Sequence, residues 1–184
     1  SFRGCTIGQI RGGNSMRLAS LTWASDVALL LAAARETGVQ ISAWTVSEIN
    51  EHNLDRCIDS LNSADVILLH PAQQEPHFES VIKRLDGRIP VISFGLDPAL
   101  WSFSTVSSRV VSTANAYLIY GGADNAANMI RYIGKEVLGS NFDYELPKER
   151  LWQGLYHPDF DRPGCNRAFS SLADFWQWRP RRHE

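Results

Sequence analysis

One histidine stands in a setting where an imidazole can take part in chemistry. His70 directly follows the apolar run Val66-Ile67-Leu68-Leu69 and precedes Pro71. The loop after a buried strand is a common place for active-site residues in α/β proteins. We therefore expect His70 to contact a substrate. The alternative is a histidine whose ring pairs with a loop carbonyl, because the sequence shows no partner for it.

A second candidate site lies near the start of the chain. The turn Arg11-Gly12-Gly13-Asn14-Ser15 follows a strand expected at residues 4–10. Backbone N–H groups at the start of a helix can bind an anion, so Asn14 and Ser15 are candidate substrate-binding residues. The turn lacks the Gly-x-Gly-x-x-Gly spacing of a dinucleotide site and the lysine of a P-loop. A plain turn is the alternative.

Alternating strands and helices must position these residues. Apolar runs predict parallel strands at 4–10, 39–45, 65–69 and 90–94, with helices somewhere within 16–37 and near 54–61 and 78–85. In the first helix, Leu21, Leu29 and Ala33 would share a face. The sequence thus predicts an α/β fold, a three-layer flavodoxin- or Rossmann-like parallel sheet of four or five strands in the order 2-1-3-4. Residues 112–120 are ambiguous between strand and helix, and a helix follows from Asp124 or Asn125.

The chain divides by composition into two parts. Residues 1–147 are long enough for one flavodoxin-like α/β domain, and residues 139–147 are expected to be a linker. Residues 148–184 are too few for a core of their own, and we expect an extension or linker to a missing following domain. This extension is rich in aromatic residues, including Phe175, Trp176 and Trp178.

Overall composition excludes several classes of protein. The net charge of -2 predicts no affinity for nucleic acid, and no apolar run reaches the roughly 18 residues that span a bilayer. The three cysteines, Cys5, Cys57 and Cys165, lie far apart without paired spacing, which argues against disulfides or a zinc site and favours the cytoplasm. Because the chain begins at Ser1, we expect it to be a piece of a longer protein.

Two segments resemble one known family. Gly154-Leu155-Tyr156-His157-Pro158, followed by an aromatic segment, is similar to the large subunit of cobaltochelatase (CobN) and to the related H subunit of magnesium chelatase. Tyr117-Leu118-Ile119-Tyr120-Gly121-Gly122-Ala123-Asp124-Asn125 resembles another segment of that family. The resemblance covers residues from about 117 to 178, and the earlier residues share only the α/β pattern.

The resemblance implies a function for the chain. It implies the N-terminal portion of a large subunit in a ligase that inserts cobalt into a tetrapyrrole during cobalamin biosynthesis. ATP is used by separate ATPase subunits, and the fragment alone would bind no cofactor and would not be catalytic. The expected partners are the remainder of the large subunit, those ATPase subunits and the tetrapyrrole. Magnesium in place of cobalt remains open. The alternative is a flavodoxin-like small-molecule binding or interaction module without catalysis.

The same resemblance gives roles to two residues of the extension. It implies that Tyr156 and His157 bind the substrate, and that the His157 imidazole is a candidate ligand for the incoming metal ion. The alternative is structural, since Tyr156 and His157 could anchor the extension while Pro158 fixes a turn.

Overall fold

The computed structural model describes residues 16–71, 77–149, 155–156, 168–169 and 171–178. The chain divides into two compact units, residues 1–147 (unit 1) and residues 148–184 (unit 2). The elements of unit 1, in chain order, are β1 (Arg17–Thr22), α1 (Ala24–Thr37), β2 (Gln40–Thr45), the short 3-10 helix η1 (Val46–Glu48), α2 (Leu54–Asn62), β3 (Val66–His70), α3 (Phe78–Lys83), β4 (Val91–Ser93), the 3-10 helix η2 (Pro98–Phe103), α4 (Ser108–Tyr120) and α5 (Ala123–Leu138).

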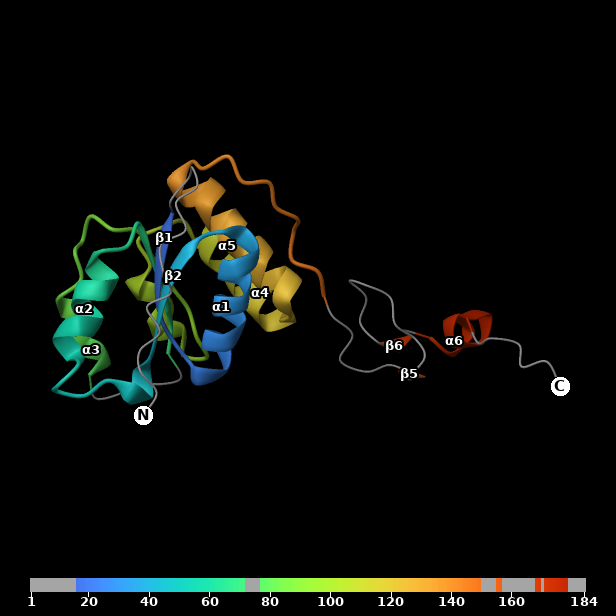
Figure 1. Ribbon diagram of the computed structural model, residues 1–184, viewed down its shortest axis with the longest axis horizontal. Helices are drawn as coiled ribbons and strands as arrows, with labels where there is room; N and C mark the ends of the chain where they lie inside the picture. Colours follow the sequence, from blue (N-terminus) through green and yellow to red (C-terminus); the bar gives the residue numbers. More distant parts are fainter. Residues whose placement is uncertain (1–15, 72–76, 150–154, 157–167, 170, 179–184) are drawn as a thin grey trace. The chain divides into compact units, whose positions relative to one another are not determined.

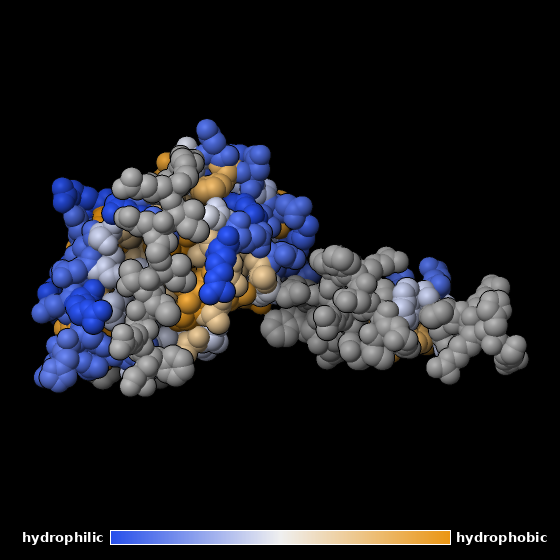
Figure 2. All heavy atoms as spheres, in the orientation of Figure 1, coloured by the Kyte–Doolittle hydropathy of each residue, from blue (hydrophilic) through white to orange (hydrophobic). Residues whose placement is uncertain are grey.

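The strands of unit 1 form a four-stranded parallel sheet in the order β2-β1-β3-β4. The helices α1, α4 and α5 cover one face of this sheet, and α2 and α3 cover the other (Figure 1). Unit 1 is therefore a three-layer α/β fold, which confirms the fold class predicted from the sequence. The described strands follow the order 2-1-3-4, with residues 17–22 as the first strand. Hydrophilic side chains cover much of its coloured surface in Figure 2.

The central strands are apolar on both sides because both faces of the sheet are covered. Along β3, Val66 and Leu68 join the core beneath α1, α4 and α5, whereas Ile67 and Leu69 join the core beneath α2 and α3. This alternation follows from the two-residue period of a strand. It also places His70, the next residue, on the same face as Leu68.

The strand β1 corrects the expectation for the start of the chain. Residues 17–22 pair with both β2 and β3, in a region where the sequence suggested a helix. Leu21 consequently packs in the core beneath α2 and α3, while Ala33 packs in the opposite core, so they do not share a helical face. A short apolar run does not distinguish a buried strand from a helix by its period. The strand expected at residues 4–10 lies outside the described residues.

The connection between α4 and α5 depends on glycine. The ambiguous residues 112–120 are helical, and α4 ends at a pair of glycines, Gly121 and Gly122, with φ angles of 67° and 87°. Side chains disfavour such angles. The Asn125 side chain then donates to the Gly121 carbonyl at 2.8 Å, which fixes the turn between the two helices.

Residues 139–147 have no regular structure, yet they are held against α5. The Ser140 amide donates to the Gly134 carbonyl at 2.9 Å, and the Glu145 amide donates to Asn128 Oδ1 at 3.0 Å. The buried Tyr117 hydroxyl from α4 donates to the Glu145 carbonyl at 2.5 Å. The segment expected to be a linker is therefore part of the packed surface of unit 1.

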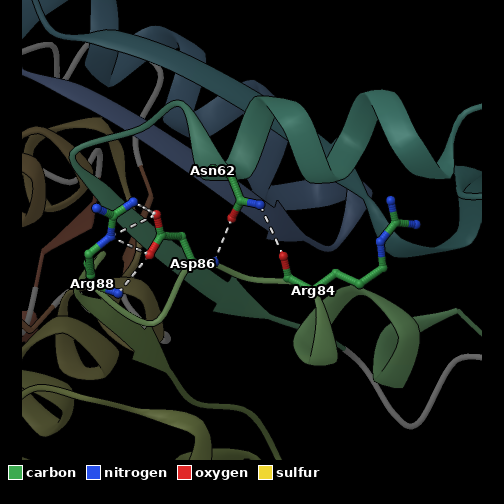
Figure 3. A network of polar contacts seen from close by, with 4 residues as sticks. All are labelled: Asn62, Arg84, Asp86 and Arg88. Atoms are coloured by element: carbon green, nitrogen blue, oxygen red, sulfur yellow. Dashed lines mark hydrogen bonds and ion pairs between the residues drawn. The ribbon is translucent and has the colours of Figure 1, made fainter.

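Polar contacts at the opposite layer tie α2 to the loop between α3 and β4 (Figure 3). Asn62 at the end of α2 donates to the Arg84 carbonyl at 3.0 Å and accepts from the Asp86 amide at 2.8 Å. The Asp86 carboxylate in turn accepts from the guanidinium of Arg88, at 3.0 Å from Nε and 2.7 Å from Nη2. The loop is thus fixed by side chains rather than by regular structure.

The described residues of unit 2 form two short strands and a helix. The strands β5 (Leu155–Tyr156) and β6 (Ala168–Phe169) pair antiparallel, and α6 spans Leu172–Trp178. The buried Phe169 ring lies 5.5 Å from the Phe175 ring and 5.1 Å from the Trp178 ring, measured between centroids. This aromatic cluster forms the described core of the extension.

Candidate functional site

The strand order of the sheet reverses between β1 and β3, and the C-terminal ends of these two strands mark the topological switch point. β1 continues through α1 to β2, on one side of the sheet centre, and β3 continues through α3 to β4, on the other side. Open parallel sheets bind ligands at such a switch point. Thr22 and His70, the last residues of the two strands, are paired in register there.

A histidine–aspartate pair occupies this switch point. His70 Nδ1 lies 2.7 Å from Oδ2 of Asp26, which sits in the first turn of α1. The Thr22 hydroxyl donates to the same carboxylate oxygen at 2.9 Å. The side chains of His70 and Asp26 are each 18% exposed. The three residues thus form a hydrogen-bonded group that is mostly, but not wholly, shielded from water.

Aromatic rings fix the plane of the imidazole. The Trp23 ring stacks on it, with centroids 5.6 Å apart and an angle of 9° between the planes. The Phe94 ring, in the residue after β4, lies 5.0 Å away at 48°. Within the described part of the chain, the buried Trp23 Nε1–H has no hydrogen-bond acceptor. The site therefore combines the His70–Asp26 pair with two aromatic neighbours, and the indole N–H of Trp23 is a donor without an acceptor among the described residues.

The charge state of Asp26 decides which ring nitrogen of His70 carries the proton. Burial is the largest single influence on the pKa of the Asp26 carboxyl, and it raises that pKa. Hydrogen bonds from His70, Thr22 and Ser25 and the charge of the imidazole together outweigh burial, so the pKa lies below its usual 3.8. An ionised carboxylate only accepts. His70 therefore donates from Nδ1, and in the neutral ring Nε2 carries the lone pair.

The loop after β4 supports the backbone at the end of β3. Gly95 packs so closely that an added Cβ would lie 2.7 Å from Leu100 Cδ1 and 3.1 Å from the Pro71 carbonyl oxygen. The Trp101 Nε1–H donates to the Gly95 carbonyl at 3.2 Å. The loops that follow β3 and β4 are thus packed together directly beside His70.

Among the predicted site residues that the structure describes, His70 is at this edge. Asn14, Ser15 and His157 lie outside the described residues. Asn14 and Ser15 were predicted to follow the first strand, but in the structure they precede β1 in the sequence. The residue that follows the C-terminal end of β1 is Trp23. Tyr156 lies in β5 of unit 2, where it pairs with Ala168.

Sequence reasoning missed three members of the group, namely Thr22, Trp23 and Asp26. They follow the apolar run of residues 18–21, and the sequence Thr22-Trp23-Ala24-Ser25-Asp26 has the composition of a strand end followed by the first turn of a helix. Once β1 is recognised, these residues fall at the same edge as His70. The signal was present, but it depended on identifying the run as a strand.

A separate hollow of about 390 Å³ lies on the α5 side of unit 1. It is lined by Glu36, Asp124, Asn128, Arg131, Asp143, Tyr144 and Glu145. Arg131 is paired with Glu36 at 2.9 Å, so the remaining charged side chains of the lining are acidic. None of these residues belongs to the group around His70.

Two further searches of the described residues bear on function. They contain no cluster of three or more His, Cys, Asp or Glu side chains that could hold a metal ion. Among the same residues, no helix combines the length and apolar character needed to cross a membrane.

Comparison with known proteins finds a family that part of the chain resembles. Residues 115–184 match the family model described as CobN/Magnesium Chelatase, a stretch that runs from the middle of α4 through α5 and unit 2. A search of curated proteins finds no match. Among solved structures, the chain is similar to the catalytic subunit of cobaltochelatase from Mycobacterium tuberculosis, with a TM-score of 0.58 and 20% sequence identity.

That structural likeness covers 80% of this chain and 12% of the mycobacterial chain. At such an identity it shows a shared fold, in agreement with the α/β architecture of unit 1. The sequence match over residues 115–184 contains both segments that resemble cobaltochelatase. Residues 115–184 are therefore similar in sequence to the CobN/magnesium chelatase family.

Proposed function

We propose that this chain is an N-terminal part of the large subunit of a metal chelatase that inserts cobalt into a tetrapyrrole in cobalamin biosynthesis. The observation that carries the proposal is the family match over residues 115–184. The fold shared with a cobaltochelatase catalytic subunit supports it, and so does the length relation, since the chain spans 12% of that subunit.

The proposal includes a division of labour within a cytoplasmic complex. Separate ATPase subunits hydrolyse ATP, and the complete large subunit binds the tetrapyrrole and the metal. The sequence of this chain contains no P-loop motif, which agrees with that division. We propose that the 184-residue chain alone does not insert metal.

Within unit 2, we propose that His157 and Tyr156 contact the metal or the tetrapyrrole in the complete subunit. The test is His157→Ala in that subunit, with metal insertion and thermal unfolding measured together. Loss of insertion at unchanged thermal stability supports a contact with metal or substrate. A large loss of stability instead indicates that His157 only anchors the extension.

The direct test of the proposed function is metal insertion by the complete subunit with its ATPase subunits. The absorbance of the tetrapyrrole is followed after addition of Co²⁺ or Mg²⁺, with and without ATP. We expect insertion of cobalt that requires ATP. Insertion of magnesium alone would assign the chain to a magnesium chelatase H-type subunit, and no insertion of either metal would overturn the proposal.

A second candidate is a small-molecule binding or interaction module without catalysis. The group around His70 at the switch point favours it, because this edge of the sheet binds ligands in many α/β proteins that share only the fold. Quenching of tryptophan fluorescence in the 184-residue chain by flavin mononucleotide, and no quenching by a tetrapyrrole, would favour this module over the chelatase.

A further inference from the structure

We propose that His70 accepts a proton at Nε2 from a pyrrole N–H group of the tetrapyrrole, with Asp26 as the residue that positions its ring. This rests on the proposed function, since it names a residue for the reaction of that enzyme class. It goes beyond that function by locating a proton acceptor at the switch point of unit 1.

The chemistry requires such an acceptor. A metal ion displaces pyrrole N–H protons when it enters the macrocycle. For the proton assigned to His70, the pyrrole N–H bond breaks and a new N–H bond forms at Nε2. The electron pair of the broken bond stays on the pyrrole nitrogen, where it binds the metal. The resulting imidazolium returns its proton to water, and any further pyrrole proton that the metal displaces leaves to water directly.

The geometry of the pair suits this role. A general base is effective when a second group orients it and stabilises its charged form. The Asp26 carboxylate does both, because it accepts from Nδ1 at 2.7 Å and carries the charge opposite to that of an imidazolium. The hydroxyl of Thr22, at 2.9 Å, keeps the carboxylate in place. The lone pair is thereby directed to Nε2.

The surroundings leave Nε2 for a ligand. The hydrogen bond of the ring goes through Nδ1, and within the described part of the chain no residue is bonded to Nε2. The stacked Trp23 ring and the tilted Phe94 ring limit rotation of the imidazole. Aromatic side chains of this kind also favour contact with a flat, apolar macrocycle.

A proton acceptor fits the site better than a metal ligand. A bound metal ion needs several ligands, and the described residues provide no group of three. Proton transfer needs one lone pair and an orienting partner. Asp26 is the charged side chain that the structure places in contact with His70, and the other contacts come from Thr22, Trp23 and Phe94.

The test uses His70→Asn in the complete subunit with its ATPase subunits. The Asn side-chain amide can still donate to Asp26, as Nδ1 does, but the Nε2 lone pair is gone. We expect the rate of cobalt insertion to fall about 100-fold or more, a typical contribution of general base catalysis, while tetrapyrrole binding and thermal stability stay near wild type. His52→Asn, at an exposed position of the same unit, is the matched control and should leave the rate unchanged.

A second variant keeps the test independent of folding. Asp26→Asn removes the charge that stabilises the imidazolium, so the rising limb of the pH–rate profile should move to lower pH and its plateau should fall. A structural role would not shift the profile. Wild-type rates in His70→Asn, or an unshifted profile in Asp26→Asn, would overturn the proposal while the chelatase function stands. A wild-type complex that inserts no metal would instead overturn the proposed function and this inference with it.

Discussion

Two carboxylates of unit 1 keep their charge in opposite ways. At Asp86, side-chain and backbone hydrogen bonds from Arg88 lower the pKa to about 2, and the Arg88 side chain is 90% exposed. At Asp26, burial works against the charge, and bonds from His70 and Thr22 outweigh it to hold the pKa below 3.8. Water can take the place of Arg88 at Asp86, whereas His70 and Thr22, the partners of Asp26, are mostly buried.

This difference separates a surface contact from a candidate site. Asp86 fixes a loop between α3 and β4, as Figure 3 shows. Asp26 fixes the tautomer and the direction of a histidine at the ligand-binding edge of the sheet. A lowered carboxyl pKa alone does not distinguish the two cases. The two cases are distinguished by the residue that pairs with the carboxylate and by the access of water to that residue.

The largest effect is expected from Asp26→Ala. The substitution leaves the His70 Nδ1–H and the Thr22 hydroxyl without their acceptor at a site that is mostly closed to water. We expect a loss of about 1–3 kcal/mol in the free energy of unfolding, measured by urea denaturation of the 184-residue chain at neutral pH. Asp86→Ala is the control, with a clearly smaller loss. Equal losses in the two variants would show that the surroundings of Asp26 are not special.

A smaller effect is expected from acid. Because the pKa of Asp26 in the folded chain lies below 3.8, its contribution to stability is complete above the pKa of the unfolded chain and is lost as the pH falls through the folded value. The stability difference between wild type and Asp26→Asn should therefore shrink as the pH falls below about 5. Urea unfolding at a series of pH values measures this. A difference that grows as the pH falls below about 5 would contradict the lowered pKa of Asp26.

The smallest effect concerns salt. In a double-mutant cycle, the coupling between Asp86 and Arg88 should fall towards zero in about 1 M NaCl, where the Debye length is about 3 Å. The coupling between Asp26 and His70 should change much less, because both side chains are only 18% exposed. Equal salt dependence of the two couplings would remove the contrast between a shielded and an exposed pair.

The sequence was sufficient for the fold class, but it did not predict the strand at residues 17–22. Continuous apolar runs identified β3 and β4, and helical spacing of Leu54, Cys57, Ile58 and Leu61 identified α2. The run Leu18-Ala19-Ser20-Leu21 contains a serine and is followed by helical residues, and its strand nature depends on pairing with β2 and β3. Such long-range pairing does not appear in local periodicity.

The candidate site was only partly predictable for the same reason. The position of His70 after a buried strand pointed to the correct edge of the sheet. Its partner Asp26 is 44 residues away in the sequence, and the register of Thr22 against His70 brings the two together. Without the position of β1, no spacing rule connects them.

The most direct test of the central claim is the protonation state of the His70 ring. The ring ¹⁵N shifts of the 184-residue chain can be measured by NMR at a pH where the histidines are neutral, with His52 as the exposed reference. We predict that His70 carries its proton on Nδ1, bonded to an ionised Asp26, and that Nε2 is unprotonated. A His70 ring with the proton on Nε2 would contradict the account, because that nitrogen could then accept no proton.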